Sequence, residues 1–515
     1  MRRLASLLIS LVAALAFGQS YTLTVLHTDD LHGHIEPVKV GKGMYGGYAK
    51  HVTLLMRFAA TEPNPVVLSG GDTFQGTMYF KVYEGLADAF FMNLMGYRAM
   101  AVGNHEFDLG PKPLGVFARN VQFPMLAANL DVSGDPDLKD VIKRSVVIVV
   151  GGQRIGLVGA VTPQLPDVSS PGPTVKMLEL MSNVQKEVDQ FSAQGINKVI
   201  LLSHLGYELE KKVAATVRGV DVIVGGHSHS LLGTFANPDF PASEGPYPTV
   251  VQNPGGNKTL LVASWEWGKV LGHLQVDFNA KGAVTAWRGA PVVVDASIPD
   301  DPFALSALDA FRMPILAASR KVVGKSDAGV PNEEGRLRES AMGDLIADAT
   351  LEACAASNPD FAVVNSGGVR APLPSGTITY DKLVEVQPFA NTLIVMELTG
   401  KEIKAALEYG LSGLEEKEGR FLQVSRGFHY AFDASKPVGS RLLSASLKGQ
   451  PVEDGRTYRV AVNQYIANGG DGFEVLKAAP GMRWNLGLVD IDALEAYVAK
   501  YPLPSKPEGR IDGSG

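Results

Sequence analysis

The 515-residue sequence contains a single cysteine, Cys354. One cysteine cannot form an intramolecular disulfide, and it cannot supply the thiolates of a structural zinc site. Cys354 lies in an apolar pattern of helical period, where a small buried residue is the expected role and a nucleophile is not. Neither the fold nor the chemistry is therefore expected to depend on sulfur.

Long hydrophobic runs are scarce as well. The run at residues 4–17 follows Arg2 and Arg3, and Ala14-Leu15-Ala16 is a typical cleavage site. A transmembrane helix needs roughly 20 apolar residues, which no segment reaches. We expect residues 1–16 to be a signal peptide, and the mature protein to be soluble, to lack a membrane anchor, and to be exported to the periplasm or the extracellular space.

Positive charge is in deficit, since 47 lysines and arginines stand against 54 acidic residues, a net charge of −7. This balance argues against nucleic acid as the main partner. A small anionic substrate would then need local positive charge from metal ions or arginines.

No internal repeat is present, and the chain is too long for one hydrophobic core, so two domains are expected. Its first part alternates strand, loop and helix, including one helix at 83–95, which predicts a layered α/β domain. Residues 249–252, 259–263 and 274–278 are expected to form antiparallel strands that add a second sheet. Pro299-Asp-Asp-Pro302 breaks this pattern, and the helix expected to follow to about Ser319 is the candidate linker.

A polar cluster follows an apolar, strand-like segment in Ala101–Gly110. Asn104, His105 and Asp108 lie there within five residues. This trio suits a metal-bound phosphate ester, with Asn104 as a neutral oxygen ligand, His105 as a proton donor and Asp108 as the group that orients it. Polar residues are common in turns after strands, so the hypothesis requires further ligands from elsewhere.

Four other expected strands also end in residues that bind metals. Each case alone is weak, but parallel strands of one sheet bring their carboxyl ends to the same edge. Five of the ten histidines lie in the five loops. The candidates, loop by loop, are Asp30 and His32; Asp72; Asn104 and His105; His204; and His227 with His229.

The second half carries a different set of polar and aromatic residues. An expected strand at 361–364 runs into Asn365-Ser-Gly-Gly-Val-Arg370, whose arginine could hold a phosphate through two hydrogen bonds. Phe389 and Tyr465 stand near glycine-rich loops, with Asp471 close behind Tyr465. This combination predicts stacking on a flat base and hydrogen bonds to sugar hydroxyls. Taken singly, each aromatic residue is equally typical of a hydrophobic core.

Together these motifs resemble the secreted 5′-nucleotidase family, including bacterial UDP-sugar hydrolase/5′-nucleotidases, over essentially the whole mature length. The resemblance implies a two-domain α/β protein that hydrolyses phosphate from nucleotides, with UDP-sugars and nucleoside di- and triphosphates as further substrates. Residues 21–297 would form a four-layer α/β/β/α metallophosphoesterase sandwich, 298–322 a linker helix, and 323–512 the C-terminal α/β nucleotide-binding domain. A monomer is expected.

The resemblance also implies a role for each candidate residue. Two divalent ions, Zn²⁺ or Mn²⁺ by donor chemistry, would activate a bridging water for in-line attack on phosphorus. One ion would be held by Asp30, His32, Asp72 and His229, and the other by Asp72, Asn104, His204 and His227. His105 and Asp108 match the catalytic pair. The substrate-binding positions match Arg338, Asn365, Arg370, Phe389, Tyr465 and Asp471.

Three positions depart from the family pattern. Asp29 replaces an asparagine and is expected to make the edge of the metal site more negative, whereas Ser366 and Ala390 replace glycines near the substrate. Three alternatives stay open: a 2′,3′-cyclic-nucleotide phosphodiesterase, a thiosulfate-ester hydrolase of the same superfamily, and a non-catalytic secreted binding protein. The Gly-Asn-His-Glu-Phe-Asp motif and the aromatic pair favour nucleotide hydrolysis.

Overall fold

In the computed structural model, residues 20–389, 391–415 and 417–514 are described. The expected signal peptide at 1–16 and the departure at Ala390 lie outside them. The chain divides into two compact units at Met313 and Pro314.

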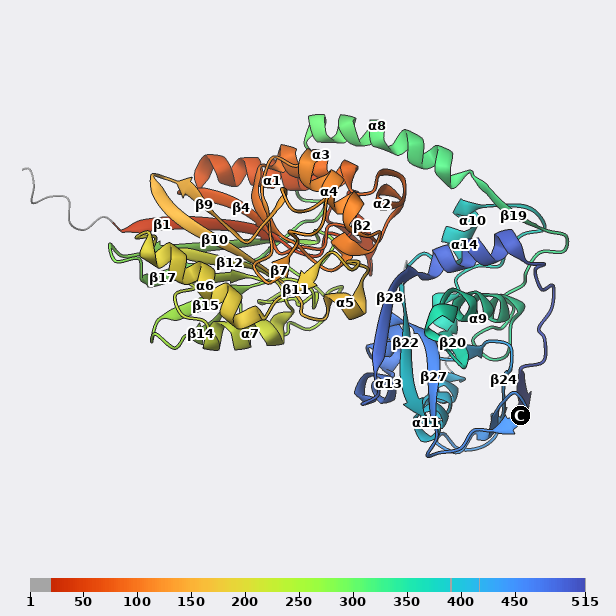
Figure 1. The fold of residues 1–515 in the computed structure, drawn as a ribbon. Coiled ribbons are helices and arrows are strands. Elements are labelled where there is room, and N and C mark those ends of the chain that lie inside the picture. The colour runs from red at the N-terminus through yellow and green to blue at the C-terminus, as the bar shows by residue number, and fades with distance from the viewer. Residues whose placement is uncertain (1–19, 390, 416, 515) are drawn as a thin grey trace, which may run out of the picture. The chain divides into compact units, whose positions relative to one another are not determined.

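The first unit is built on two mixed β-sheets (Figure 1). Along the first sheet the strands are β17 (Val284–Arg288), β16 (Val270–Phe278), β1 (Tyr21–Thr28), β4 (Pro65–Ser69), β5 (Tyr97–Ala101), β6 (Met125–Leu126) and β8 (Ile142–Lys143), while β18 (Val292–Val293) pairs with β16. Along the second they are β14 (Thr249–Gln252), β15 (Lys258–Val262), β13 (Val222–Val224), β12 (Val199–His204), β10 (Gln153–Val161) and β9 (Ser145–Val150).

Alternate residues of these strands face two different cores, as the two-residue period of a strand requires. Ile200 and Leu202 of β12 join Leu23 and Val25 of β1 in a core shared by both sheets. Leu201, from the opposite face of β12, packs with residues of the helices that cover the second sheet. The shared core thus places one sheet directly against the other.

Helices complete the outer layers on both sides (Figure 1). This arrangement confirms the expected α/β/β/α sandwich. The first sheet is covered by α1 (Tyr48–Thr61), α3 (Leu86–Met95) and α4 (Pro111–Asn120), and the second by α6 (Leu180–Ala193) and α7 (Tyr207–Thr216).

One of two local predictions for this unit is wrong. The helix expected at 83–95 is confirmed as α3, but it begins at Leu86, because Glu84 and Gly85, which separate it from α2 (Met78–Tyr83), both adopt left-handed backbone angles. A Cβ on Gly85 would lie 2.2 Å from the Phe74 ring, so this glycine permits a close approach. The strands expected to add a second sheet separate: β14 and β15 lie in the second sheet, whereas β16 joins the first, antiparallel to β1.

The parallel strands bring the predicted loops together. In the first sheet β1, β4 and β5 run parallel, and in the second β10, β12 and β13 do. Their carboxyl ends carry the five loops that the sequence singles out. The packing of the two sheets therefore gathers side chains from five distant segments.

The second unit contains a five-stranded sheet with helices on both faces. Its strands run in the order β23 (Leu422–Val424), β20 (Phe361–Asn365), β27 (Thr457–Asn463), β22 (Thr392–Thr399) and β28 (Arg483–Val489). One face packs near α9 (Ala341–Ala353) and α14 (Asp490–Lys500), and the other near α11 (Gly400–Gly410) and α13 (Glu474–Ala478). Cys354, at the end of α9, is free and fully buried, which confirms its predicted structural role.

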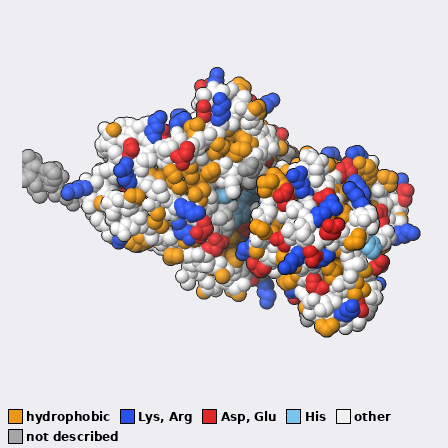
Figure 2. All heavy atoms as spheres, turned by 60° about the horizontal axis from the view of Figure 1, so that its bottom comes forward, with side chains coloured by type: hydrophobic (Ala, Val, Ile, Leu, Met, Phe, Trp, Pro, Cys, Tyr) orange, Lys and Arg blue, Asp and Glu red, His pale blue; other side chains and the backbone are white. Residues whose placement is uncertain are grey.

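The division between the units falls inside α8 (Pro302–Ser319), which contains Pro314. Across the described part of the chain, no helix is both long and apolar enough to cross a bilayer. Acidic and basic side chains are interspersed on the face that Figure 2 shows. The surplus of acidic residues therefore does not form a single field on that face.

Candidate functional site

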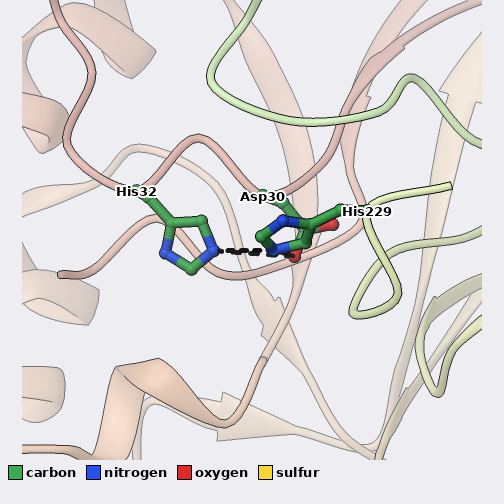
Figure 3. Close-up of side chains that lie close together, drawn as sticks. All are labelled: Asp30, His32 and His229. Carbon is green, nitrogen blue, oxygen red and sulfur yellow. Dashed lines mark hydrogen bonds and ion pairs between the residues drawn. The ribbon is translucent and has the colours of Figure 1, made fainter. Parts of the chain in front are cut away.

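The loops of the first unit form two clusters of side chains that can bind metals. Asp30, His32 and His229 make the first (Figure 3), and Asp72, His204 and His227 make the second. In each cluster the potential ligand atoms lie within 4.8 Å of one another. The structure thus brings together six of the seven metal-ligand candidates, and Asn104, the seventh, is buried between β5 and the short helix that begins at His105.

In the first cluster, both imidazole rings are oriented through Nδ1. His32 donates from Nδ1 to the Phe74 carbonyl oxygen (2.9 Å), and His229 donates from Nδ1 to the Glu266 carboxylate (2.5 Å). The two Nε2 atoms are left 3.2 Å apart, and that of His229 lies 3.3 Å from Asp30 Oδ1. Two ring nitrogens and a carboxylate that converge in this way need a shared proton or cation, and the donor set fits a divalent metal.

In the second cluster, His204 donates from Nδ1 to the Gly70 carbonyl oxygen (2.8 Å), so its Nε2 is directed at Asp72 Oδ2, 2.9 Å away. Asn104 Oδ1 is buried without a hydrogen-bond partner among the described residues, and His204 Nε2, also buried, faces the Asp72 carboxylate. Burying a polar atom without a partner is unfavourable. A cation held by both atoms would satisfy them, so this donor set fits a metal as well.

The pKa shifts of the four histidines differ: burial lowers the pKa of two, whereas Asp72 raises that of His204, and Asp30 and Glu266 raise that of His229, in both cases against burial. Burial lowers the pKa of His32 well below its usual value, and burial together with His204 lowers the pKa of His227 to about 3. Both rings are therefore neutral at pH 7, the form that binds metal. For His204, burial acts downward but Asp72 outweighs it and raises the pKa to about 10. A cation bound at the same nitrogen replaces that proton.

The backbone of these loops is strained where the ligands sit. Non-glycine residues rarely adopt positive φ, and strain of this kind clusters at functional sites. A glycine is required as well, because a Cβ on Gly103 would lie 2.1 Å from Asp72 Oδ1. Five of the seven ligand candidates have φ between 48° and 77°: Asp30, His32, Asp72, His227 and His229.

His105 and Asp108 form a pair beside the clusters. His105 donates from Nδ1 to Asp108 Oδ2 (2.5 Å), and Ser169 donates to the other oxygen of Asp108 (2.8 Å). The free Nε2 of His105 lies 4.0 Å from Asp72 Oδ2. Burial lowers the pKa of His105, but Asp108 and Asp72 outweigh burial and raise it to about 9, whereas a bound cation acts in the opposite direction. The arrangement suits a proton donor at a metal-bound substrate.

In the second unit, three of the predicted substrate residues are joined by hydrogen bonds. Asn365 Nδ2 donates to one carboxylate oxygen of Asp471 (2.7 Å), and the Tyr465 hydroxyl donates to the other (2.9 Å). Asn463 donates to Asn365 Oδ1 (2.9 Å). Tyr465 is 47% exposed, so part of this residue is accessible to a ligand.

Two further predicted residues form a second group in this unit. The Arg370 guanidinium lies 5.9 Å from the centroid of the Phe389 ring, and Phe389 is 52% exposed. Arg338, by contrast, is paired with Glu334 at 2.9 Å. Five of the six substrate residues therefore fall into two small clusters, and Arg338 is not brought into either.

Comparison with known proteins gives the chain its family. Residues 23–231 match the calcineurin-like phosphoesterase family, and residues 322–478 match the 5′-nucleotidase C-terminal domain. The 5′-nucleotidase of Diplobatis ommata is 36% identical, over 98% of this chain and 92% of its own length. For human 5′-nucleotidase the figures are 34%, 98% and 94%. The chain belongs to the 5′-nucleotidase family. The crystal structure of a 5′-nucleotidase precursor from Thermus thermophilus is 46% identical, covers 96% of this chain and 100% of its own, and superposes with a TM-score of 0.66.

Within this 5′-nucleotidase fold, Glu106 has a role that sequence analysis missed. Its fully buried carboxylate accepts four backbone hydrogen bonds, from Asp72 (3.1 Å), Thr73 (2.7 Å), Phe74 (3.2 Å) and Gly103 (2.7 Å). Burial and the charge of Asp72 raise the pKa of Glu106 to about 7. Glu106 thus ties the Asp72 loop to the Asn104 loop. The only available signal was its place between His105 and Asp108.

A cleft of about 430 Å³ in the second unit contains two more cationic residues that were not predicted. Arg336 and Lys417 line it together with Arg370 and Ser366. Glu334, which also lines the cleft, is already paired with Arg338. Positive charge therefore predominates in the lining of this cleft, which favours an anionic ligand.

The departures from the family pattern can now be placed. Asp29 is buried and accepts hydrogen bonds from the backbone (2.7 Å) and hydroxyl of Ser264, and its charge, after burial, helps to raise the pKa of the neighbouring Asp30. Ser366 donates to the Gly419 carbonyl oxygen (3.2 Å). A Cβ on Gly367 would lie 3.0 Å from Gly419 Cα, so this glycine serves the approach of two backbone segments.

Proposed function

We propose that this protein is an exported, metal-dependent 5′-nucleotidase that releases phosphate from nucleotides. The observation that carries the proposal is the pair of Asp/His clusters with ligand atoms within 4.8 Å of one another, beside the His105–Asp108 pair. Membership of the 5′-nucleotidase family supports it. The exposed aromatic rings of Phe389 and Tyr465 support a nucleotide over a simpler phosphate ester.

We assign the ligands of the two ions by their positions in the clusters and, for Asn104 and the sharing of Asp72 between the ions, by the resemblance to the family. One ion is held by Asp30, His32, Asp72 and His229, and the other by Asp72, Asn104, His204 and His227. When bound, two divalent ions activate water and neutralise the oxygens of the phosphoryl group. Four imidazoles, two carboxylates and one amide oxygen are donors suited to Zn²⁺ or Mn²⁺.

The remaining candidate residues act on the substrate, or orient a residue that does, without binding a metal. His105, oriented by Asp108, protonates the leaving oxygen or stabilises the transition state. In the second unit, Phe389 and Tyr465 stack on the base, Asp471 and Asn365 bind the ribose or its neighbouring atoms, and Arg370 binds phosphate. Arg338 contributes only if it exchanges its partner Glu334 for the substrate.

Domain boundaries, location and assembly remain proposals of the same kind. We assign residues 21–297 to the metallophosphoesterase domain, 298–322 to the linker that contains α8, and 323–512 to the nucleotide-binding domain. The apolar run after Arg2-Arg3 supports export to the periplasm or the extracellular space, and the protein is proposed to act as a monomer. Size-exclusion chromatography and cell fractionation test these assignments.

Hydrolysis of a substrate panel is the direct test of the function. Inorganic phosphate is measured for the nucleotides with a terminal phosphate and for the sugar phosphate, and the products of UDP-glucose and the cyclic nucleotides, whose hydrolysis frees no inorganic phosphate, are separated by chromatography. AMP, ADP, ATP, UDP-glucose, 2′,3′-cyclic nucleotides and a sugar phosphate are offered to the purified protein. We expect release from AMP, loss of release after chelation, and recovery after addition of Zn²⁺ or Mn²⁺. Preference for a cyclic nucleotide would favour the phosphodiesterase alternative, and metal binding without hydrolysis of any substrate would favour the binding protein. Hydrolysis of a thiosulfate ester in a separate assay would favour the remaining alternative.

Removal of one aromatic ring tests the nucleotide site separately. Phe389→Ala should raise KM for AMP at least about fivefold with little change in kcat, because stacking on one base contributes roughly 1–3 kcal/mol. Hydrolysis of ribose 5-phosphate, which has no base, should not change. Leu443→Ala removes a similarly exposed apolar side chain of the same unit and is the control. Equal losses with AMP and ribose 5-phosphate would show that Phe389 does not bind the base.

A further inference from the structure

The segment from Ser264 to Lys269, between β15 and β16, packs behind the first metal cluster. The backbone N–H of Trp267 donates to the Asp30 carbonyl oxygen (2.7 Å), and His51 donates to the Gly268 carbonyl oxygen (2.6 Å). Trp265 and Trp267 both have positive φ. The backbone of this segment is strained at both tryptophans and is hydrogen-bonded to Asp30, a candidate metal ligand. The segment therefore has a role beyond connecting two strands.

Glu266 and Lys269 of this segment form a chain of contacts that ends at His229. One carboxylate oxygen of Glu266 accepts from His229 Nδ1 (2.5 Å), and the other accepts from Lys269 Nζ (2.6 Å). Lys269 Nζ also lies 3.4 Å from the ring centroid of Trp265 and 4.3 Å from that of Trp267. The lysine side chain is 2% exposed.

This chain of contacts restrains the His229 ring, which is more exposed than the other two side chains of the first cluster. The side chain of His229 is 36% exposed, whereas those of Asp30 and His32 in the same cluster are buried. Packing against neighbouring residues therefore restrains the His229 ring less than it restrains the side chains of Asp30 and His32. A carboxylate on Nδ1 fixes the tautomer, directs Nε2 toward Asp30 and makes the ring a stronger donor to a metal.

Lys269 determines where the Glu266 carboxylate can lie. A lysine buried between two indole rings cannot exchange its partner for water, and the cation–π contacts compensate in part for its lost hydration. Its ion pair with Glu266 holds that carboxylate charged and at a fixed position. The two tryptophans, expected from the sequence to be packing residues, thus also enclose a cation.

We propose that Glu266 is a positioning residue that orients His229 and strengthens binding of the ion at Asp30 and His32, and that Lys269 holds Glu266 in place. The inference rests on the proposed role of His229 as a metal ligand. Neither Glu266 nor Lys269 touches substrate in this scheme. Their loss should therefore appear in metal affinity before it appears in chemistry.

Metal affinity of the purified full-length protein tests the inference. Binding of Zn²⁺ is measured by competition with a chelator, and bound metal is counted by elemental analysis. We expect Glu266→Ala to lower the affinity for one of the two ions by roughly 10- to 100-fold and to leave the affinity for the other unchanged. Lys269→Met should lower the affinity for the same ion by a smaller factor. Glu266→Gln, which retains an acceptor for His229, should lie between wild type and Glu266→Ala.

Two controls separate positioning from a general loss of structure. Lys198 also lies over two aromatic rings of the first unit, 5.5 Å from Tyr21 and 5.8 Å from Phe278, but at the opposite end of β12 from His204. Lys198→Met should leave both affinities unchanged. In a His229→Ala background, Glu266→Ala should have no further effect, because the ring that Glu266 orients is absent.

The outcomes distinguish this inference from the ligand assignment. If His229→Ala weakens one ion but Glu266→Ala does not, the positioning role is overturned and the ligand assignment stands. If His229→Ala leaves both ions unchanged, the assignment of His229 itself is wrong. Additive losses in the double variant, or an equal loss in Lys198→Met, would also overturn the positioning role.

Discussion

Replacing His105 with asparagine is expected to lower turnover of AMP at least about 100-fold while both ions stay bound. His105 lies outside the two ligand clusters, so its removal takes no donor from either ion. Asparagine can still hydrogen-bond to Asp108, but it cannot carry a proton to the leaving oxygen. Turnover from initial rates and bound metal from elemental analysis together check this result.

The matched control for His105 is His429→Asn in the second unit. His429 also pairs with an aspartate, Asp512, at 3.2 Å, but it is 39% exposed and takes part in neither cluster. Its replacement should leave turnover unchanged. Near-normal turnover of His105→Asn would remove His105 from the mechanism, and loss of an ion would make it a ligand instead of a proton donor.

Replacing Glu106 with glutamine is expected to cause the largest loss of stability, about 2–6 kcal/mol. Each carboxylate oxygen of Glu106 accepts two backbone N–H groups: one from Thr73 and Phe74, and the other from Asp72 and Gly103. Either orientation of the glutamine amide turns an NH₂ group toward two donors. Two buried N–H groups then lose their acceptor, at about 1–3 kcal/mol each.

Tryptophan fluorescence during denaturant unfolding can follow this effect in the correct unit. Three of the four tryptophans, Trp265, Trp267 and Trp287, lie in the first unit. Glu187→Gln is the control, because Glu187 is also buried but accepts a bond from Ser145 through one oxygen (2.5 Å). An unchanged midpoint for Glu106→Gln would show that the four bonds do not tie the loops together.

Much of the candidate metal centre could be predicted from local sequence. Asp30, His32, Asp72, His204 and His227 follow short apolar segments, and parallel strands bring such ends to one edge. Cys354 could be placed in a core from its apolar helical surroundings alone. The length of the chain predicted two domains, and the alternation of strands and helices predicted an α/β fold. Both predictions were confirmed.

Glu106 and Glu266 could not be found in this way. Glu106 accepts from Thr73, 33 positions earlier in the chain, and Glu266 accepts from His229, 37 positions away. Nothing in the flanking residues of either glutamate indicates those partners. The start of α3 could not be placed for the same reason, because the break before it reflects the packing of Gly85 against Phe74.

The sequence by itself determined which donors the chain offers, since side-chain chemistry and the period of strands are local properties. It also determined the family, through motifs that follow one another along the chain in the order typical of that family. Only the tertiary structure decided how each donor is aimed: which carbonyl or carboxylate occupies Nδ1 of each histidine, and which carboxylate is tied up elsewhere, as Asp29 is by Ser264. Those contacts depend on how two sheets pack, and packing joins residues that no local pattern relates.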